Sequence, residues 1–373
     1  MTQESAPKPV DVVMAVYNGE RHLPAALDGV LAQTFRDFDL IVVDDGSTDG
    51  TVSILGDYAA RDARVRVIRS PRNMGLVHTR NACLAACRAP LMAIADADDL
   101  FAPERLQKQV DFLDRHPKVG FLGTNATLID SNGHPLGRDQ LLPLDDGRIR
   151  FELLLGGCFW NTSTIYRTDL VRNAGAYRAG YDGVEDYDLW SRLLSLTRAA
   201  NLAERLVCQR LHASSFTAAL TNVLKRQSAV ARSRLAAYLE RDVSEDDALA
   251  ALTLFMYGWR VPARHADVPG GLRLLADIAA RAETREAGDL AAVFRHRVSR
   301  SLRQQAELQA SGHRRHALGL FAHAIRWDPS VIASKDAARL LVRCALPVAV
   351  VAALRQARRR SSESSPVEQT HRL

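Results

Sequence analysis

Residues 40–50 read Leu-Ile-Val-Val-Asp-Asp-Gly-Ser-Thr-Asp-Gly, a short apolar run that ends in acidic and turn-forming residues. Two other runs of strand length end in the same way: residues 12–16 lead into Tyr17-Asn18-Gly19-Glu20, and residues 91–95 lead into Asp96-Ala97-Asp98-Asp99. Open α/β sheets bind their ligands at the carboxyl ends of their strands, so we expect these three ends to form one site. Aspartates gathered at one edge repel one another, which favours a bound cation. The pattern therefore predicts a site for a metal ion and a phosphorylated ligand.

The chain alternates between apolar runs and helical patterns as far as residue 125, which is typical of βαβ units and a mostly parallel sheet. Residues 131–147 are rich in Gly, Pro, Asp and Asn and are predicted to be a loop. After about residue 217 the sequence is rich in alanine, leucine and arginine and is predicted to be helical. We therefore predict an α/β domain in residues 1–217, a helical region in residues 218–357 and a disordered basic and polar tail in residues 358–373.

Composition and charge narrow the class of protein. Of the 373 residues 47% are hydrophobic, enough for one large core or two smaller ones, and the formal net charge is +6. The five cysteines show no disulfide or zinc spacing, the N-terminus lacks an apolar signal core, and residues 340–354 are too interrupted to span a bilayer. We expect a cytoplasmic protein without a nucleic-acid partner. The arginines at positions 355 and 358–360 are typical of a solvated tail, and peripheral contact with anionic lipid at the inner face of the membrane is the alternative.

Several segments of the first 217 residues resemble the family 2 glycosyltransferases. Residues 42–51 resemble a nucleotide-sugar-binding signature of that family, and the resemblance continues through residues 73–81, 96–99, 185–190 and 210–215, in the right order. The resemblance implies the GT-A fold and an inverting transfer of one sugar from a nucleotide-diphospho-sugar, with a UDP-sugar favoured. It also implies Mn²⁺ or Mg²⁺ as cofactor and a glycan or lipid-linked saccharide as acceptor, in the synthesis of cell-envelope polysaccharide.

The resemblance assigns metal and donor binding to Asp96, Asp98 and Asp99, with His212 as a candidate further ligand or a residue that closes over the diphosphate. A hard divalent cation that bridges carboxylate oxygens and a diphosphate holds the donor and stabilises the charge of the leaving group. The alternative interpretation is an ordinary acidic turn in which Asp98 or Asp99 caps the following helix.

The resemblance places the nucleotide near Tyr17, Asn18, Glu20, Asp45 and Arg80. Asp45 would accept a hydrogen bond from the base, Tyr17 would offer a stacking surface, and Arg80 would meet the base or the diphosphate. Three of these residues have simpler alternatives. Tyr17 could be a half-buried tyrosine at a strand end, Glu20 could begin the first helix, and Arg80 could be a solvated helix arginine.

Asp186 is the candidate general base. An inverting single displacement needs one carboxylate to take the proton of the acceptor hydroxyl. Glu185 and Asp186 begin a predicted helix, whose positive dipole end stabilises a carboxylate, so a helix-end charge without chemistry is the alternative. Trp190, within the same helix, is expected to pack rather than to stack on sugar. The choice of sugar is expected to depend on residues 159–161 and on the loop at 131–147.

Two rival functions remain. A sugar nucleotidyltransferase also needs metal and acidic strand ends, but it normally carries a glycine-rich basic phosphate loop where this chain has Tyr17-Asn18-Gly19-Glu20. A non-catalytic nucleotide-binding or scaffold protein with a helical interaction tail is the second rival.

Overall fold

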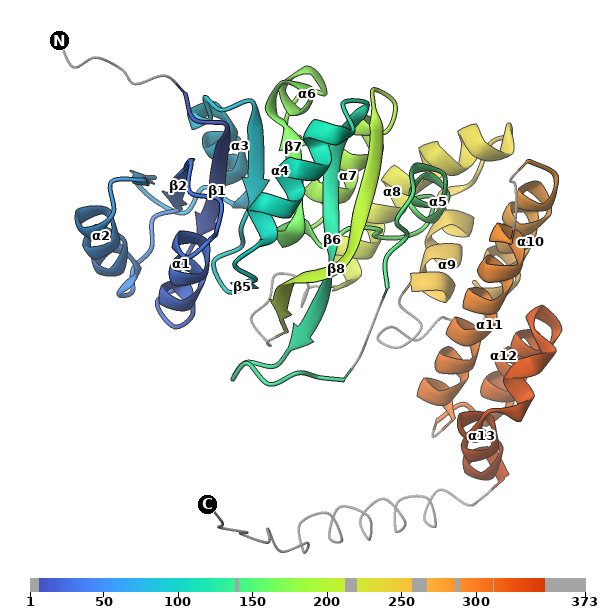
Figure 1. The fold of residues 1–373 in the computed structure, drawn as a ribbon. Coiled ribbons are helices and arrows are strands. Elements are labelled where there is room, and N and C mark those ends of the chain that lie inside the picture. The colour runs from blue at the N-terminus through green and yellow to red at the C-terminus, as the bar shows by residue number, and fades with distance from the viewer. Residues whose placement is uncertain are drawn as a thin grey trace, which may run out of the picture. The chain divides into compact units, whose positions relative to one another are not determined.

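The computed structural model describes residues 7–137, 141–211, 220–256, 267–285, 289–310 and 312–345. These residues fall into two compact units, Met1–Glu240 and Arg241–Leu373 (Figure 1). The first unit holds the sheet together with helices α1 to α8, and the second holds helices α9 to α13.

The first unit is built around an eight-stranded mixed sheet with the order β3-β2-β1-β4-β7-β6-β8-β5. Strands β1 to β4 are mutually parallel, as predicted, whereas β7 runs antiparallel to both β4 and β6. Strand β6 pairs in parallel with β8, and the short β5 pairs antiparallel with β8. The strands are β1 (Val10–Val16), β2 (Phe38–Asp44), β3 (Val65–Arg69), β4 (Leu91–Ile94), β5 (Leu100–Phe101), β6 (Val119–Ile129), β7 (Ile165–Arg167) and β8 (Arg198–Arg210).

The helices of the first unit cover the sheet and bury its apolar side chains. Helix α1 directs Leu23, Leu27 and Val30 into the core, because residues spaced by three and four share one helix face. Helix α3 packs on β1 and β2, and α4 packs on β6 and β8. The helices are α1 (Leu23–Leu31), α2 (Thr51–Arg61), α3 (Leu76–Ala86), α4 (Arg105–Arg115), α5 (Asp146–Glu152), α6 (Thr168–Asn173), α7 (Glu185–Leu193) and α8 (Leu220–Leu239).

The register of the parallel strands brings the polar strand ends to one edge. Val16 at the end of β1 lies level with Asp44 at the end of β2, and the Asp45 amide donates to the Val16 carbonyl at 2.8 Å. In the pair β1–β4, Ile94 of β4 lies level with Val13 of β1, and the chain then continues into the aspartates of residues 96–99. The helical crossovers force this arrangement, because each returns the chain to the same end of the sheet.

Some predicted elements differ in extent from the observed ones. The sequence predicts a strand at residues 204–209, whereas the observed β8 already begins at Arg198, because it runs along the full length of the buried β6. The sequence predicts an extended segment at residues 162–166, but the structure has a 3₁₀ turn at Asn161–Ser163 followed by β7. The predicted loop at 131–147 ends where α5 begins, at Asp146, and the Asp145 carboxylate caps that helix by accepting from the Arg148 amide at 2.9 Å.

The alternative in which Asp98 or Asp99 caps the next helix is wrong. Helix α4 begins only at Arg105, after the short strand β5. The side chain of Asp99 instead accepts a hydrogen bond from the backbone amide of Arg210 on β8, at 2.7 Å. A capping side chain must lie next to the helix terminus, and the intervening strand removes both aspartates from it.

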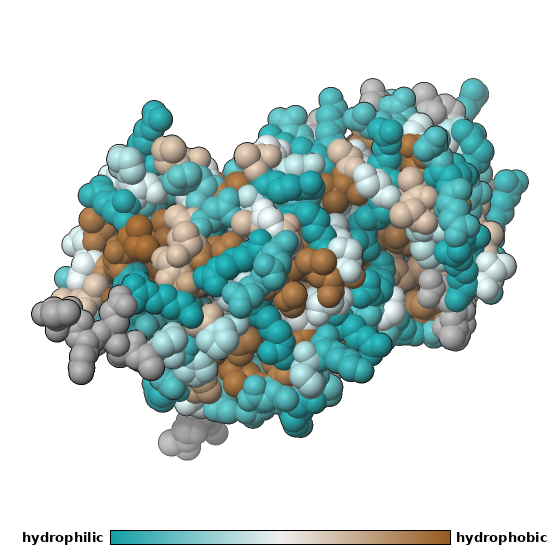
Figure 2. All heavy atoms as spheres, turned by 90° about the horizontal axis from the view of Figure 1, so that it is seen from above, coloured by the Kyte–Doolittle hydropathy of each residue, from teal (hydrophilic) through white to brown (hydrophobic). Residues whose placement is uncertain are grey.

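The second unit is helical, as the alanine- and leucine-rich pattern predicted. Its helices are α9 (Glu245–Met256), α10 (Val268–Arg285), α11 (Leu290–Gln309), α12 (Arg314–Trp327) and α13 (Lys335–Ala345). Buried leucines and a ring contact of 5.2 Å between Phe255 and Phe294 form its core. Among the described residues, no helix combines the length and apolarity needed to cross a membrane. On the face drawn in Figure 2, hydrophilic side chains surround scattered apolar patches.

We expect Gly46→Ala to destabilise the first unit by about 2 kcal/mol or more, because strained backbone and a steric clash add. Gly46 has a φ of +73°, and a Cβ there would lie 2.5 Å from the carbonyl carbon of Arg72. The matched control is Gly56→Ala on α2, where a Cβ meets nothing within 4 Å. Alanine should stabilise that helix by about 0.5–1 kcal/mol. Chemical denaturation measures both, and equal effects at the two sites would contradict the prediction.

Candidate active site

Hydrogen bonds join the loop after β1 to the loop after β2. The side-chain oxygen of Asn18 accepts from the Thr48 amide at 2.9 Å, and the Asn18 amide donates to the Ser47 hydroxyl at 2.8 Å. The Glu20 carboxylate accepts from the Gly50 amide at 2.7 Å. Helix α1 begins only at Leu23, so Glu20 fastens the two loops together rather than beginning a helix. These contacts hold the loop that carries Tyr17, whose side chain is 48% exposed.

Asp44, which ends β2, and Asp45, which follows it, have different partners. Asp44 is buried, and its Oδ1 accepts from the Ser47 amide at 3.1 Å, which is the contact of a tight turn. Asp45 accepts from two backbone amides, those of Met74 at 2.8 Å and Gly75 at 2.9 Å. Asp45 therefore fixes the loop that leads into α3, and its carboxylate keeps lone pairs for a further donor.

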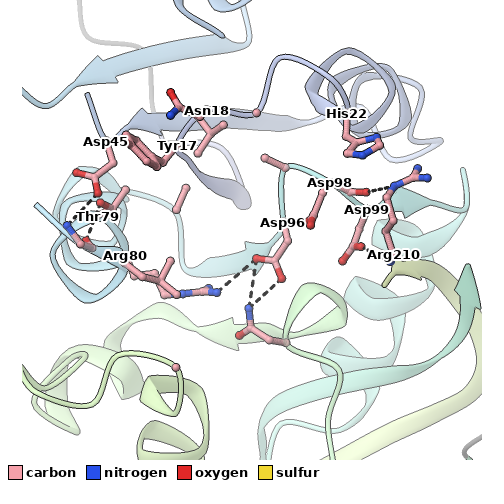
Figure 3. A pocket seen from close by; sticks show the side chains of 18 of the residues that line it. Tyr17, Asn18, His22, Asp45, Thr79, Arg80, Asp96, Asp98, Asp99 and Arg210 are labelled. Carbon is pink, nitrogen blue, oxygen red and sulfur yellow. Dashed lines mark hydrogen bonds and ion pairs between the residues drawn. The ribbon is translucent and has the colours of Figure 1, made fainter. Parts of the chain in front are cut away.

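A cavity of about 710 Å³ opens at this edge of the sheet. In Figure 3, Tyr17, Asn18 and Asp45 lie at one end of it, Asp98, Asp99 and Arg210 lie at the other, and Asp96 lies between them. The cavity brings together eight of the predicted site residues. These are Tyr17, Asn18, Asp45, Arg80, Asp96, Asp98, Asp99 and Asp186.

Two predicted site residues are not among those that line the cavity. Glu20 makes the contact between loops described above. His212 lies outside the described residues, so its predicted role stays a prediction.

An arginine from β8 holds residues 96–99, the acidic turn. Arg210 is buried and donates from its amide to Asp99 and from its Nε to the Asp98 carbonyl at 2.8 Å. Burial, and then the charges of Asp98 and Asp96, raise the pKa of the Asp99 carboxyl well above its usual value. Burial raises the pKa of Asp96 as well, against the opposing effect of Arg80. A cation bound at this edge would therefore favour the ionised form of these carboxyls.

Arg80 on α3 is buried among acidic partners, so the solvated interpretation of this residue is wrong. Its Nε lies 3.1 Å from Glu185 Oε1, and its Nη2 lies 3.4 Å from Asp96 Oδ1. The side-chain oxygen of Asn161, in the orientation that satisfies its neighbours, accepts from both terminal nitrogens at 2.9 and 2.8 Å. Arg80 thus links the acidic turn, the start of α7 and the segment before β7.

The six residues 185–190 divide their roles by helix face. Asp188 is fully buried and pairs with Arg178 and with Arg192, the latter at 2.8 Å. The Trp190 indole donates to the hydroxyl of Tyr166 at 2.8 Å in the core, which confirms that it packs.

Asp186 is directed into the cavity instead. Burial, and then the neighbouring charge of Glu185, raise the pKa of the Asp186 carboxyl to about 7. A carboxylate with that pKa exchanges protons near neutral pH, as a general base must.

The acidic turn has the donor set that a hard divalent cation uses. Asp96, Asp98 and Asp99 all line the cavity. The described residues contain no ready-made group of three or more histidines, cysteines or carboxylates arranged to hold a metal. Mg²⁺ and similar ions bind through one or two carboxylates and complete their coordination with waters and substrate phosphates. The residues present therefore fit a cation that arrives with a phosphorylated ligand.

Sequence reasoning did not assign Glu185, Gln209 or Arg210 to the cavity. Glu185 contacts Arg80, and Gln209 and Arg210 line the wall beside the acidic turn. Asn161, which was expected to influence the choice of sugar, also contacts Arg80. Glu185 and Arg210 belong to the segments 185–190 and 210–215 of the family resemblance. Their contacts could not be predicted, because their partners lie far away in the chain. Of residues 159–161 only Asn161 lines the cavity, because Phe159 packs against Trp190 with a ring distance of 5.2 Å.

Comparison with known proteins shows which sequences this chain resembles. The sequence model "Glycosyl transferase family 2" matches residues 11–175. The putative glycosyltransferase EpsE of Bacillus subtilis is 33% identical over 222 residues, which cover 57% of this chain and 76% of EpsE. The amylovoran biosynthesis glycosyltransferase AmsE of Erwinia amylovora is 30% identical, over 52% of this chain and 74% of its own length. The O-antigen biosynthesis glycosyltransferase WbnJ of Escherichia coli is 29% identical, over 55% of this chain and 81% of its own length.

Solved structures share the fold at low sequence identity. S. aureus TarS 1–349 in complex with UDP-GlcNAc aligns with a TM-score of 0.53 and 18% identity, over 86% of this chain and 91% of that one. The mannosyltransferase PcManGT from Pyrobaculum calidifontis, in complex with GDP-Man and Mn²⁺, aligns with a TM-score of 0.50 and 17% identity, over 88% and 87%. The predicted GT-A fold is therefore confirmed. With this fold, and with a relative matched over three quarters of its length, the chain belongs to the family 2 glycosyltransferases.

Proposed function

We propose that this protein transfers one sugar from a nucleotide-diphospho-sugar to a hydroxyl of a glycan or lipid-linked saccharide, with inversion at the anomeric carbon. The observation that carries the proposal is the shared cavity. It places the acidic turn and a carboxyl of pKa about 7, Asp186, on the walls of one space. Relatives named for amylovoran and O-antigen biosynthesis favour an acceptor in polysaccharide synthesis.

The donor is proposed to lie along the cavity from Tyr17 to the acidic turn. Its base would stack near Tyr17 and donate to Asp45, and its diphosphate would lie at Asp96 and Asp98 with Arg80 nearby. Mn²⁺ or Mg²⁺ held by these two aspartates would supply positive charge that stabilises the nucleoside diphosphate as it leaves. TarS was solved with UDP-GlcNAc, and this supports a UDP-sugar as donor, with a GDP-sugar as the alternative from PcManGT.

Asp186 is proposed to accept the proton of the attacking hydroxyl. The acceptor oxygen must approach the anomeric carbon from the side opposite the leaving diphosphate, so one carboxylate on that side suffices. Glu185 keeps its contact with Arg80 and holds negative charge beside Asp186, which favours the protonated product of the transfer step.

Calorimetric titration with UDP, GDP and dTDP, each with and without Mn²⁺, tests the donor site. We expect one nucleotide to bind more tightly with metal, and product formation with its sugar conjugates then tests transfer. Tight binding without a metal effect would contradict the metal assignment. Metal-dependent binding without turnover would favour the scaffold function, and synthesis of a nucleotide-sugar from a nucleoside triphosphate would favour a nucleotidyltransferase.

The pH dependence of transfer follows from the pKa of Asp186. Its folded-state pKa is raised from 3.8 to about 7, so the carboxyl is mostly protonated, and inactive as a base, below that value. We expect kcat/KM to rise with pH through about 7 and to fall about tenfold per pH unit well below it. A profile measured from pH 5.5 to 8.5 checks this, and a flat profile across that range would contradict it.

We also propose peripheral contact with an anionic membrane surface through the C-terminal end of the chain. On α13 the apolar residues Ala338, Leu341, Val342 and Ala345 are exposed on one helix face. Further along the sequence, arginines stand at positions 355 and 358–360. Co-sedimentation with vesicles that contain phosphatidylglycerol, compared with phosphatidylcholine alone, measures this contact, and equal binding to both would contradict it.

A further inference from the structure

Arg105 is a buried arginine at the start of α4, behind the acidic turn. Its side chain is 1% exposed and is among the largest fully buried side chains of the protein. Its Nη2 donates to the carbonyls of Ile94 at 2.7 Å and Thr164 at 3.4 Å, and its Nε donates to Gln109 Oε1 at 3.1 Å. The guanidinium also lies 5.2 Å from the centre of the Phe101 ring.

The partners of Arg105 are all neutral. Within the described part of the chain, no carboxylate lies at ion-pair distance from its guanidinium. A buried cation without an ionic partner is costly, so its retention needs a compensating interaction. The charges that act on it are those of Asp96 and Asp99, which counter the lowering of its pKa by burial. Asp96 and Asp99 therefore help to keep Arg105 charged inside the protein.

The two carbonyls that Arg105 holds belong to two walls of the cavity. Ile94 ends β4, two residues before Asp96, and Thr164 ends the segment that carries Asn161. The same two segments are joined by the Ile94 amide, which donates to the Thr164 carbonyl at 2.8 Å, and by the Asp96 amide, which donates to the Thr162 hydroxyl at 3.2 Å.

Gln109 strengthens this connection from one helical turn further along α4. It accepts from Arg105, and its Nε2 donates to the Ser163 carbonyl at 2.7 Å. Residues four apart lie on one helix face, so the pair reaches both segments from behind.

We propose that Arg105, supported by Gln109, is a positioning residue for the donor site. It fixes the acidic turn against the segment that carries Asn161 before the donor and cation bind. This role of Arg105 rests on the proposed function, because it concerns the same donor site. We expect Arg105 to affect metal-dependent binding of nucleotide without contacting the nucleotide.

The experiment compares Arg105→Met and Arg105→Lys with a matched control, Arg167→Met. Arg167 also donates to two backbone carbonyls, those of Val119 at 3.1 Å and Leu113 at 3.0 Å. It lies on β7 level with Leu91, at the end of β4 remote from the acidic turn. Both methionine variants therefore lose the same kind of contact, and only Arg105 is connected to the cavity.

Binding of UDP or GDP with Mn²⁺ is the first readout. We expect Arg105→Met to weaken it by about 10–100-fold, the range for removing a residue that orients metal ligands. Arg167→Met should bind like the wild type at a comparable loss of stability, and Arg105→Lys, which keeps the charge, should recover part of the affinity. If Arg105→Met binds nucleotide as tightly as Arg167→Met does, the proposal is overturned.

Amide hydrogen exchange is the second readout and needs no ligand. Faster exchange at Ile94 and Asp96 in the Arg105 variants, but not in Arg167→Met, is expected, and unchanged exchange would overturn the proposal. If the wild type binds no nucleotide, the proposed function fails, and the exchange data still decide whether Arg105 holds the two segments. If Arg105→Met does not fold, nucleotide binding and amide exchange are measured on Arg105→Lys alone. Lysine cannot reach two carbonyls in the same geometry, so weaker binding and faster exchange are expected in that variant. Wild-type exchange and binding in that variant would overturn the proposal.

Discussion

Asp186→Asn is expected to lower kcat by about 10²–10⁴-fold, the usual contribution of a positioned general base. The amide keeps the shape of the side chain but cannot take the proton of the acceptor hydroxyl. Binding of the nucleotide with Mn²⁺ should remain, because the proposed donor contacts are made by other residues. Turnover measured with saturating donor, beside calorimetric titration of the nucleotide, separates the two effects.

Asp186→Asn is not expected to destabilise the folded protein, so a loss of turnover can be assigned to the lost base. The pKa of Asp186 is raised in the folded protein, so this carboxyl favours folding below about pH 4 and disfavours it as the pH rises through about 7. A neutral asparagine avoids that cost, so at pH 8 Asp186→Asn should unfold no more easily than the wild type. The matched control is Asp182→Asn, because the Asp182 Oδ1 accepts from the Val77 amide at 3.3 Å and asparagine keeps that acceptor. Equal loss of turnover in both variants would contradict the assignment of Asp186 as the base.

Asp98→Asn is expected to abolish most of the effect of Mn²⁺ on nucleotide binding. A carboxylate ligand that bridges a cation to a diphosphate contributes several kcal/mol, which corresponds to roughly 10²–10³-fold in affinity. The backbone contact between the Asp98 carbonyl and Arg210 survives the change, so the turn itself should persist. Titration of nucleotide at several Mn²⁺ concentrations measures the loss.

A control for Asp98→Asn makes the same chemical change far from the cavity. Asp111 lies on the exposed face of α4, where its Oδ1 accepts from Gln107 at 2.8 Å and an amide can replace it. Asp111→Asn should bind nucleotide with the same metal dependence as the wild type. Retention of the metal effect in Asp98→Asn would contradict the role of Asp98 and would assign the cation to Asp96 and Asp99.

The sequence correctly predicted which edge of the sheet carries the cavity. Each of the three polar strand ends follows an apolar run, and parallel strands with helical crossovers must place their carboxyl ends together. Tyr17, Asp45 and Asp98 therefore meet in one cavity, as predicted. The antiparallel insertion of β7 between β4 and β6 was not visible, because a strand of three residues has too little pattern to define its direction.

The patterns along the chain define local features: which runs become strands, where the strands end, and which polar residues follow them. Which charged side chains are buried, and which groups they contact, depends on the folded structure. The sequence left open whether Arg80 meets the nucleotide or is solvated, and only folding brings Glu185 and Asp96 against it. Arg105 carried no signal in the sequence. The physical reason is that strand and helix patterns depend on neighbours in the chain. The burial and ionisation of a side chain instead depend on groups that folding brings from distant segments.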